Sequence, residues 1–216
     1  MTKKQRAAAV SERLTELYPE APCALDWRGE PWKLLVMGRL SAQCTDARVN
    51  IGCEELFSVY PTPEALANAT QKEVEAIIRP CGLFRTKAES IRLACQKLVY
   101  EYGGQLPSEM DALLSFPGVG RKIANLLRGD VFGLGGIVAD THCIRIAARL
   151  GLTAKGEKDP LKTERALSPL IAPSQQSDFC HRIVYFGREV CTARSPRCGE
   201  CVLKDLCKNG SGGQNG

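Results

Sequence analysis

The sequence predicts an all-α protein. Apolar residues recur at helical spacing along most of the chain, as in Ala7, Val10, Leu14 and Leu17. No run alternates apolar and polar residues as a half-buried strand would. Aromatic residues make up only 6% of the chain, which argues against an all-β domain, where they are enriched.

Start and stop signals divide the chain into many short helices. The first helix is expected to end before Pro19, and a buried helix is expected to begin at Pro31, because proline suits the first helical turn. Two later helices are predicted to begin with capping boxes, at Thr70 to Glu73 and at Thr86 to Glu89. A further helix should end at Gly103. The Gly- and Ser-rich residues 209–216 are expected to be disordered.

Composition limits the class of protein. The 216 residues carry 29 Lys plus Arg against 24 Asp plus Glu, a net charge of +5 that permits a polyanionic partner without requiring one. No apolar run approaches the roughly 18 residues of a membrane helix, and no signal peptide is visible, so we expect a cytoplasmic protein without membrane contact. The odd number of cysteines, 11, argues against a disulfide scaffold.

Four cysteines gather near the C-terminal end with 6-2-5 spacing, at Cys191, Cys198, Cys201 and Cys207. A Cys-x2-Cys pair with two flanking thiolates can hold one tetrahedral metal centre. The irregular spacing fits neither common zinc template, so an iron–sulfur cluster is favoured and zinc remains the alternative. Arg194 and Arg197 lie in the loop between the first two thiols, where they are candidates for contacting phosphate. The alternative for this loop is a solvated segment.

A glycine-containing hairpin is predicted at residues 114–122, LSFPGVGRK. Gly118 and Gly120 can adopt backbone angles that are closed to other residues. The N–H groups of Gly118, Val119, Gly120 and Arg121 would then face outward at a helix N-terminus, which is an anion site suited to a DNA phosphate. A plain tight turn is the alternative.

Lys122 and Asp140 are candidate catalytic residues. Lys122 lies in the first turn of the helix after the hairpin, where the positive end of the helix dipole disfavours an ammonium and so favours the nucleophilic neutral amine. Asp140 is predicted to cap the next helix, with its carboxylate oriented by backbone N–H groups. Structural capping alone would also explain Asp140, and a phosphate-binding or solvated lysine would explain Lys122.

Five motifs in this order resemble endonuclease III, a bacterial base-excision-repair DNA glycosylase of the helix-hairpin-helix superfamily. They are Ser41-Ala42-Gln43-Cys44-Thr45-Asp46, the Gly82-Leu83-Phe84 block with Lys87-Ala88, Phe116 to Lys122, Ala139-Asp140-Thr141-His142 and the 6-2-5 cysteine spacing. The resemblance runs from the first helix to the last cysteine. It implies a two-lobed fold: a six-helix barrel domain at residues 24–134, and a helical iron–sulfur domain made of 1–23 with 135–216. The four cysteines would hold a [4Fe-4S] cluster.

The resemblance also implies an activity. Lys122 would attack the sugar C1′ of an extruded damaged pyrimidine, with Asp140 stabilising the cationic sugar, and the Schiff base would then cleave the strand 3′ to the site by β-elimination. Gln43 would fill the gap left by the flipped nucleotide, and Leu83 would wedge into the base stack. The partner would be duplex DNA containing damaged pyrimidines or abasic sites. The protein would act as a monomer at the bacterial nucleoid.

Three residues depart from the family pattern, and two other functions would explain part of the sequence. Phe186 replaces a more polar residue, with no consequence that the sequence shows. Arg39 stands where an apolar residue is expected and is a candidate for reaching the lesion pocket or the DNA. Cys44 is a packed or an oxidisable thiol close to the DNA side. A mismatch adenine glycosylase would lack the lysine nucleophile and carry a further C-terminal domain. A non-catalytic DNA-binding protein would leave Lys122 and Asp140 unexplained.

Overall fold

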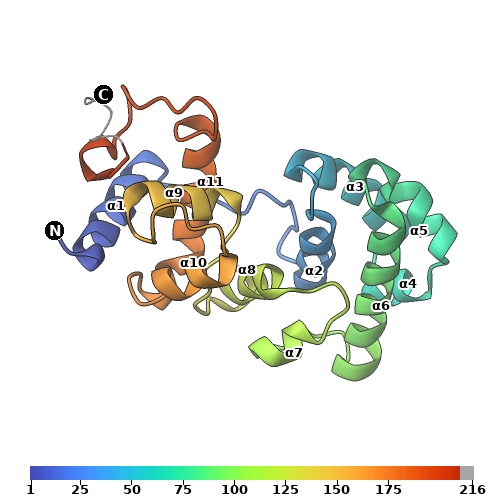
Figure 1. Cartoon of the computed structure of the whole chain (residues 1–216). Helices are drawn as coiled ribbons and strands as arrows, with labels where there is room; N and C mark the ends of the chain where they lie inside the picture. Colours follow the sequence, from blue (N-terminus) through green and yellow to red (C-terminus); the bar gives the residue numbers. More distant parts are fainter. Residues whose placement is uncertain (210–216) are drawn as a thin grey trace. The chain divides into compact units, whose positions relative to one another are not determined.

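The computed structural model describes residues 1–209, and these form two compact units (Figure 1). Unit 1 comprises Met1–Pro22 and the described residues from Gly133 onward, and unit 2 comprises Cys23–Phe132. The described residues are helical with no strand, so the predicted all-α class is confirmed. None of these helices is both long enough and apolar enough to cross a lipid bilayer.

Unit 1 joins the first helix of the chain to the C-terminal helices. Its apolar core takes Val10 and Leu14 from the first helix and Ile146 and Phe186 from the later ones, all with at most 1% of their surface exposed. The first helix begins at a Thr2–Gln5 capping box, which satisfies free N–H groups at its start. The elements of unit 1 are α1 (Lys3–Leu17), α9 (Thr141–Leu150), α10 (Pro160–Leu167), η2 (Pro173–Gln175), α11 (Gln176–Glu189) and η3 (Lys204–Leu206).

Unit 2 is built around the buried helix that the sequence placed at Pro31. Seven of the ten residues of this helix are buried, and it packs against the third, sixth and eighth helices. The predicted capping box at Thr70 is confirmed, because Thr70 and Glu73 each accept the other's backbone N–H. The elements of unit 2 are α2 (Pro31–Leu40), α3 (Asp46–Val59), α4 (Pro63–Asn68), α5 (Gln71–Ile78), η1 (Arg79–Cys81), α6 (Phe84–Tyr102), α7 (Met110–Leu114) and α8 (Arg121–Phe132).

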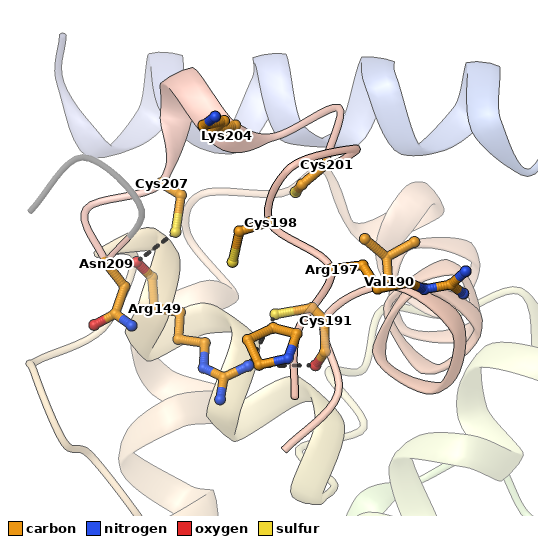
Figure 2. A pocket seen from close by; sticks show the side chains of 10 residues that line it. Arg149, Val190, Cys191, Arg197, Cys198, Cys201, Lys204, Cys207 and Asn209 are labelled. Atoms are coloured by element: carbon orange, nitrogen blue, oxygen red, sulfur yellow. Dashed lines mark hydrogen bonds between the residues drawn. The ribbon is translucent and has the colours of Figure 1, made fainter. Parts of the chain in front are cut away.

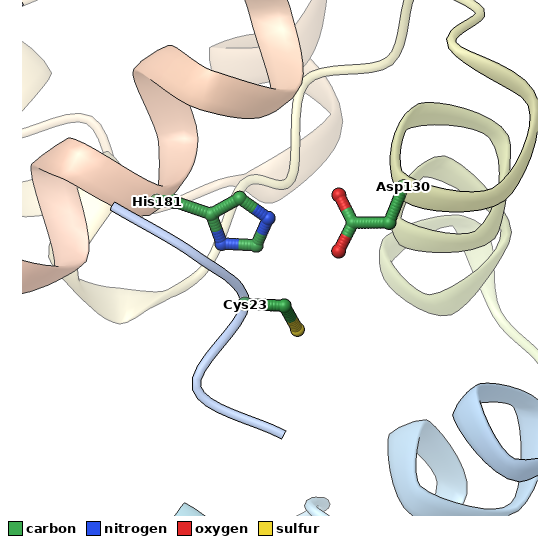
Figure 3. Close-up of side chains that lie close together, drawn as sticks. All are labelled: Cys23, Asp130 and His181. Carbon is green, nitrogen blue, oxygen red and sulfur yellow. The ribbon is translucent and has the colours of Figure 1, made fainter. Parts of the chain in front are cut away.

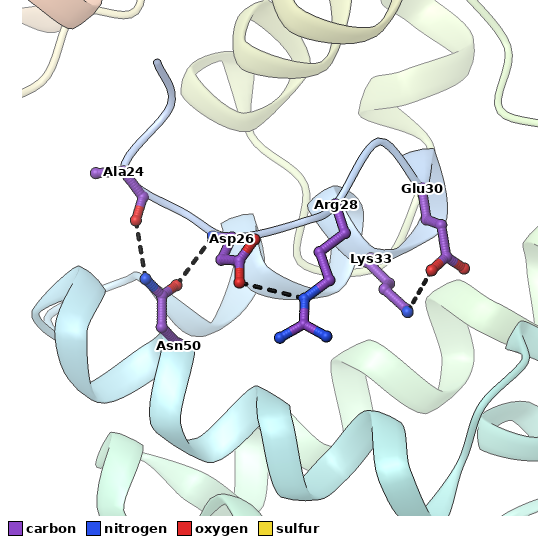
Figure 4. A network of polar contacts seen from close by, with 6 residues as sticks. All are labelled: Ala24, Asp26, Arg28, Glu30, Lys33 and Asn50. Atoms are coloured by element: carbon purple, nitrogen blue, oxygen red, sulfur yellow. Dashed lines mark hydrogen bonds and ion pairs between the residues drawn. The ribbon is translucent and has the colours of Figure 1, made fainter. Parts of the chain in front are cut away.

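Polar contacts hold the segment that leads into α2 (Figure 4). Asn50 of α3 donates to the carbonyl of Ala24 at 3.0 Å and accepts the N–H of Asp26 at 3.1 Å. At the beginning of the segment, the thiol of Cys23 lies against the carboxylate of Asp130 from α8 (Figure 3). Burial, followed by the charge of Asp130, raises the pKa of Cys23 to about 12, so this thiol stays protonated. The extended entry segment is thereby attached to two helices of unit 2.

The predicted capping box at Thr86 is wrong. Helix α6 begins three residues earlier than predicted, at Phe84, and its N-cap is Leu83, which has left-handed backbone angles. Thr86 therefore lies inside the helix, and its carbonyl accepts the hydroxyl of Ser90 at 2.6 Å. The glycine-led turn at Gly82 sets the start of α6 in place of a side-chain cap. The predicted disorder of residues 209–216 falls, beyond Asn209, outside the described residues.

Candidate active site and metal centre

The four cysteines with 6-2-5 spacing line one cavity in unit 1 (Figure 2). Cys191 lies two residues after the end of α11, and Cys207 follows η3 directly. Cys198 and Cys201 come from the loop between these elements, and Cys198 is exposed. The same cavity is lined by Arg149, Val190, Pro196 and Lys204. The local fold thus brings the four thiols to one place.

Two arginines of α9 hold the loop that carries Cys191. Arg149 donates to the sulfur of Cys191 at 3.2 Å (Figure 2). It also donates to the carbonyl of Thr192 at 2.8 Å and to the carbonyl of Ala193 at 3.0 Å. Arg145, one turn earlier, donates to the carbonyl of Cys191 at 3.0 Å. A guanidinium presents several N–H groups in a fixed plane, so each side chain can satisfy several loop carbonyls at once. Without these donors, the carbonyls of the loop would lack partners from α9.

The donor set fits an iron–sulfur cluster. Four cysteine sulfurs around a shared cavity are the ligands such clusters use, and soft thiolates favour iron–sulfur and zinc over hard cations. Arg149 supplies an N–H to one of these sulfurs, which is the kind of contact that tunes a bound cluster. In a bound cluster, Cys191, Cys198, Cys201 and Cys207 would be the ligands.

The two arginines of the cysteine loop differ in their surroundings. Arg194 is exposed. Arg197 is also exposed, but its Nε donates to the carbonyl of Glu189 at 2.8 Å, and a second guanidinium nitrogen donates to the same oxygen. Arg197 therefore anchors the loop to the end of α11, whereas nothing comparable fixes Arg194 among the described residues.

The hairpin of unit 2 connects α7 to α8. Gly118 has φ +77°, a left-handed value that non-glycine residues adopt at a cost. A Cβ placed on Gly118 would also lie only 2.6 Å from Cδ of Arg39, and closer still to its Nε. The side chain of Val119 is buried, with 7% of its surface exposed, so the hairpin is attached to unit 2. Gly118 is therefore required by both backbone conformation and space.

Gly120 differs from the prediction made for it. Its φ lies outside the left-handed range, and a Cβ placed on it would meet no atom within 4 Å. The prediction that Gly120 adopts backbone angles closed to other residues is therefore wrong. What the structure shows at this position is open space in front of the backbone. Arg121 and Lys122 are exposed in the first turn of α8, immediately after this open position. Two cationic side chains thus stand at the positive end of a helix.

Arg39 lies behind the hairpin. Its side chain packs against Gly118, and its Nε is buried without a hydrogen-bond partner in the described part of the chain. Its position on α2, a helix that packs against α8, explains how a residue 79 positions away reaches the hairpin. Because Gly118 has no side chain, the side chain of Arg39 can occupy the space beside it.

Asp140 caps α9, as predicted. One carboxylate oxygen accepts the N–H of Cys143 at 2.7 Å, and the backbone of Asp140 is extended. His142 lies beside it, and burial lowers the pKa of His142 below its usual value. A nitrogen of the His142 ring is 3.2 Å from the guanidinium of Arg145, which agrees with a hydrogen-bonding rather than a metal-binding histidine. Asp140 belongs to unit 1 and Lys122 to unit 2, so their pairing stays a prediction.

Gln43 and Leu83 share an unusual backbone. Both have positive φ, 54° and 47°, and the only other such non-glycine residue in the described chain is Arg28. Leu83 exposes 59% of its surface, and Gln43 is also exposed. A leucine in left-handed conformation with its apolar side chain in solvent is costly and points to a functional constraint. The sequence indicated both residues only through the family resemblance, because neither backbone strain nor side-chain exposure can be predicted from these residues alone.

The arginines of α9 and the buried lysine of α6 were missed by sequence reasoning. Arg145 and Arg149 are four residues apart and so share one face of a helix, a spacing that could have suggested a joint role. Lys87 is fully buried, and its ammonium donates to the carbonyls of Leu40 and Cys81, both at 2.8 Å. Nothing in the sequence distinguishes Lys87 from an exposed lysine.

Comparison with protein families gives two matches. Residues 36–173 match the model of the HhH-GPD superfamily of base excision DNA repair proteins. Residues 191–207, from the first to the last cysteine of the cavity, match the iron–sulfur binding domain of endonuclease III. The prediction of an iron–sulfur cluster over zinc is thus confirmed.

Similar proteins and structures agree with these matches. Endonuclease III of Synechocystis is 47% identical over 95% of this chain and 93% of its own length, and that of Escherichia coli is 35% identical over 95% and 96%. A trapped covalent intermediate of an endonuclease III with DNA superimposes with a TM-score of 0.90 at 38% identity, covering 98% of both chains. A non-covalent endonuclease III–DNA complex gives the same values. The chain belongs to the endonuclease III family within the HhH-GPD superfamily of base excision DNA repair proteins.

Proposed function

We propose that this protein acts on duplex DNA containing damaged pyrimidines or abasic sites, with Lys122 as the nucleophile and Asp140 as its partner carboxylate. The activity is that of its family, a DNA glycosylase with AP lyase activity in base excision repair. The observation that carries the assignment is an exposed lysine in the first turn of α8, directly after a hairpin with open backbone. We also infer that units 1 and 2 are the predicted iron–sulfur and barrel domains.

The hairpin supports a phosphate site. Gly118 turns the chain with a left-handed backbone, and the space in front of Gly120 is open, so a ligand can approach the main chain there. The N-terminus of α8 contributes partial positive charge, and the exposed Arg121 adds a cationic side chain there. Contacts of this kind hold the DNA backbone without reading sequence, which suits an enzyme that must act at any lesion.

The chemistry proposed for Lys122 follows from its position. The helix dipole disfavours its ammonium form, and DNA that covers the side chain would disfavour it further by removing water. The neutral amine attacks the sugar C1′, the glycosidic bond breaks and the damaged base leaves. The C1′–O4′ bond of the sugar ring then breaks, with O4′ taking up a proton, which gives a Schiff base between C1′ and the lysine. This Schiff base loses a proton from C2′ and expels the 3′ phosphate, which cleaves the strand. A relative with 38% identity has been captured as a covalent intermediate with DNA.

Asp140 is proposed to stabilise positive charge on the sugar. Its carboxylate is fixed by the N–H of Cys143, so it is oriented before the substrate binds. A fixed carboxylate favours a developing oxocarbenium ion and the protonated amine of the intermediate. Because one oxygen bonds to the start of α9, the other remains as the candidate for facing the reaction.

Gln43 and Leu83 are proposed to hold the DNA open. An extruded nucleotide leaves a gap in the duplex, and unstacking costs a few kcal/mol that inserted side chains can offset. Leu83 offers an exposed apolar wedge, and Gln43 offers an amide that can replace the hydrogen bonds of the lost base. The left-handed backbone at both positions supports this role, since strain of this kind persists at functional sites.

The cysteine loop is proposed as a second phosphate contact. Arg194 is exposed and stands on a segment fixed by Arg149 and by the bound cluster. Arg197 was predicted to contact phosphate as well. To do so, its side chain must keep its hydrogen bonds to the carbonyl of Glu189 and offer its remaining N–H group to the phosphate. We further propose that the protein works as a monomer, in the bacterial cytoplasm and at the nucleoid.

Borohydride trapping tests this function. The wild-type protein should become covalently attached to DNA containing an abasic site or thymine glycol, because borohydride reduces the Schiff base to a stable amine. Lys122→Gln should abolish trapping and leave DNA affinity nearly unchanged. Lys72→Gln is the matched control, since Lys72 is exposed on α5 away from the hairpin, and it should trap normally.

The outcomes separate the alternatives. A Lys122→Gln variant that still cross-links would overturn the assignment of the nucleophile. A wild-type protein that binds the DNA without any trapping would favour a non-catalytic binder. Release of adenine from a mismatch without cross-linking would favour an adenine glycosylase.

A further inference from the structure

The buried ammonium of Lys87 joins two loops of unit 2. It donates to the carbonyl of Leu40, the last residue of α2, and to the carbonyl of Cys81, the last residue of η1, both at 2.8 Å. Gln43 follows Leu40 by three positions, and Leu83 follows Cys81 by two. One cationic group therefore fixes the backbone just before each of the two residues that we propose to enter the duplex.

The turn that contains Leu83 is bonded to Lys87 on both sides. The backbone N–H of Lys87 donates to the carbonyl of Leu83 at 3.0 Å, in the first turn of α6. The side chain of Lys87 reaches back to the carbonyl of Cys81, which lies before Gly82 and Leu83 in the chain. The two bonds together restrain the turn in which Leu83 has its left-handed backbone.

The loop that contains Gln43 is a tight turn that begins where α2 ends. The N–H of Cys44 closes it by donating to the carbonyl of Ser41 at 3.1 Å. The last carbonyls of a helix have no partner within the helix, and the helix dipole favours a cation beside them. The ammonium of Lys87 meets the carbonyl of Leu40 at this end of α2. A side chain of α6 therefore fixes the point from which the Gln43 turn departs.

A lysine is an unfavourable residue for a buried position. Lys87 has no exposed surface, and its ammonium has no carboxylate partner in the described part of the chain. Burial of a charged group costs free energy unless hydrogen bonds compensate, and here burial lowers the pKa of Lys87 below its usual value. An apolar residue would fill the same space at a lower cost. What the ammonium adds is the pair of bonds to the two loops.

We propose that Lys87 is a positioning residue for DNA opening, which sets the spacing between Gln43 and Leu83 so that both side chains enter the duplex together. This inference rests on the function proposed above for Gln43 and Leu83. Because Lys87 is fully buried, it acts through the two loops and not by touching the DNA. Loss of its ammonium would release both backbones, and the two side chains would no longer meet the base stack in one arrangement.

The experiment compares two DNA substrates with the full-length holoprotein. In the first, thymine glycol is paired with adenine, so the duplex must be opened before reaction. In the second, an abasic site lies in an unpaired bulge, where no base pair has to be broken. Lys87→Met keeps a long side chain without the ammonium. It should slow the reaction at paired thymine glycol about tenfold or more, and change borohydride trapping at the bulged site by less than about twofold.

Arg92→Met is the matched control for Lys87→Met. Arg92 also lies on α6, and its Nε donates to the carbonyl of Ala69, the C-cap of α4, at 2.6 Å. The change removes a cationic donor from a helix-end carbonyl that leads into neither the Gln43 loop nor the Leu83 turn. A general loss of stability affects both substrates alike, so this control should leave the ratio of the two rates unchanged.

A triple variant shows whether Lys87 acts through Gln43 and Leu83. The double variant Gln43→Ala, Leu83→Ala should be slowed at paired thymine glycol and much less at the bulged site. Adding Lys87→Met to it should slow the reaction by less than about twofold more, because residues that act as a unit are not additive. Two independent contributions would multiply instead.

Equal losses on both substrates in Lys87→Met would overturn the proposal, as would effects that multiply in the triple variant. If Lys87→Met does not fold, Lys87→Arg decides the question. It keeps a cationic donor with a larger planar head, so it should show a smaller selective loss, and an unchanged ratio of rates would contradict the proposal. If neither variant folds, Lys87 maintains the fold as a whole and the proposal is wrong.

Failure of the proposed function would look different. A wild-type protein that is not trapped at the bulged abasic site would overturn the assignment of the nucleophile's chemistry. A Gln43→Ala, Leu83→Ala protein without selective loss would overturn the role proposed for these two residues. Both results are obtained with Lys87 intact, so they are distinguishable from failure of the inference about Lys87.

Discussion

The cysteine cavity of unit 1 and the hairpin of unit 2 position functional groups in opposite ways. In the cavity, the functional groups are side chains, and other side chains hold their loop: Arg149 bonds to the sulfur of Cys191 and to two loop carbonyls. In the hairpin, the groups proposed to bind phosphate are backbone N–H groups, and the main requirement is that Gly118 has no side chain. The cavity therefore depends on the side chains that hold its loop, whereas the hairpin depends on the absence of a side chain at Gly118.

This difference predicts how each site fails. Loss of a cysteine should remove the metal and with it the order of the loop, because a cluster contributes folding free energy. Addition of one methyl group to the hairpin should displace the backbone while the cavity is unaffected. Variants that separate these effects follow, from the largest expected change to the smallest.

The largest effect is expected from Cys198→Ser. Cys198 is exposed, so replacing its sulfur by oxygen changes little packing, and a loss of stability reports the loss of the cluster. The variant should lack the absorbance near 400 nm. Its thermal midpoint should fall by about 10 °C or more, since a structural metal contributes several kcal/mol and 1 kcal/mol corresponds to about 2–4 °C in a chain of this size.

Cys23→Ser is the matched control for Cys198→Ser. A serine hydroxyl can keep the contact with Asp130, so the control should retain both the absorbance and the thermal midpoint. A Cys198→Ser protein that keeps its full absorbance would show that three of the cysteines suffice, and the four-ligand assignment would be wrong.

A smaller effect is expected from Gly118→Ala in the hairpin. Alanine must adopt φ near +77°, and its Cβ would lie 2.6 Å from Cδ of Arg39, so we expect a loss of about 2–4 kcal/mol from backbone strain and overpacking. Gly120→Ala is the control, because its Cβ enters open space, and it should change stability by less than about 0.5 kcal/mol. Urea unfolding measures both.

A double-mutant cycle divides the two causes at Gly118. Adding Arg39→Ala to Gly118→Ala should recover the overpacking part, about 1–3 kcal/mol, and leave the backbone part. Cluster absorbance should be the same in all these variants, since the cavity is built entirely within unit 1. If Gly118→Ala lowers the free energy of unfolding as little as Gly120→Ala does, the hairpin does not depend on the absence of a side chain at Gly118. The contrast with the cysteine cavity would then be wrong.

The same contrast explains how far the sequence could be read. The cysteine spacing was visible because four reactive side chains at short intervals are rare, and the all-α class followed from helical periodicity. The prediction of a helix start at Thr86 was wrong because the residues around Thr86 do not show that α6 already begins after the turn at Gly82. The contacts of Arg39, Lys87 and Arg149 join residues far apart in the chain, and periodicity holds no information about such pairs.

The smallest effect, and the sharpest test of the hairpin, is expected from Arg39→Leu. The buried Nε of Arg39 has no partner in the described residues, and a buried unsatisfied donor costs about 1–3 kcal/mol, so leucine should stabilise the protein by about 1 kcal/mol. Because this nitrogen faces Gly118, we expect Arg39 to pack against the hairpin without contacting DNA, although its sequence position suggested a DNA contact. The salt dependence of DNA binding should then be unchanged in Arg39→Leu. It should fall by about 0.9 in log–log slope in the control Arg121→Leu, which removes the phosphate contact that we propose for Arg121. A fall of that size in Arg39→Leu would instead make Arg39 a phosphate ligand, and the hairpin would then depend on a side chain as the cysteine cavity does.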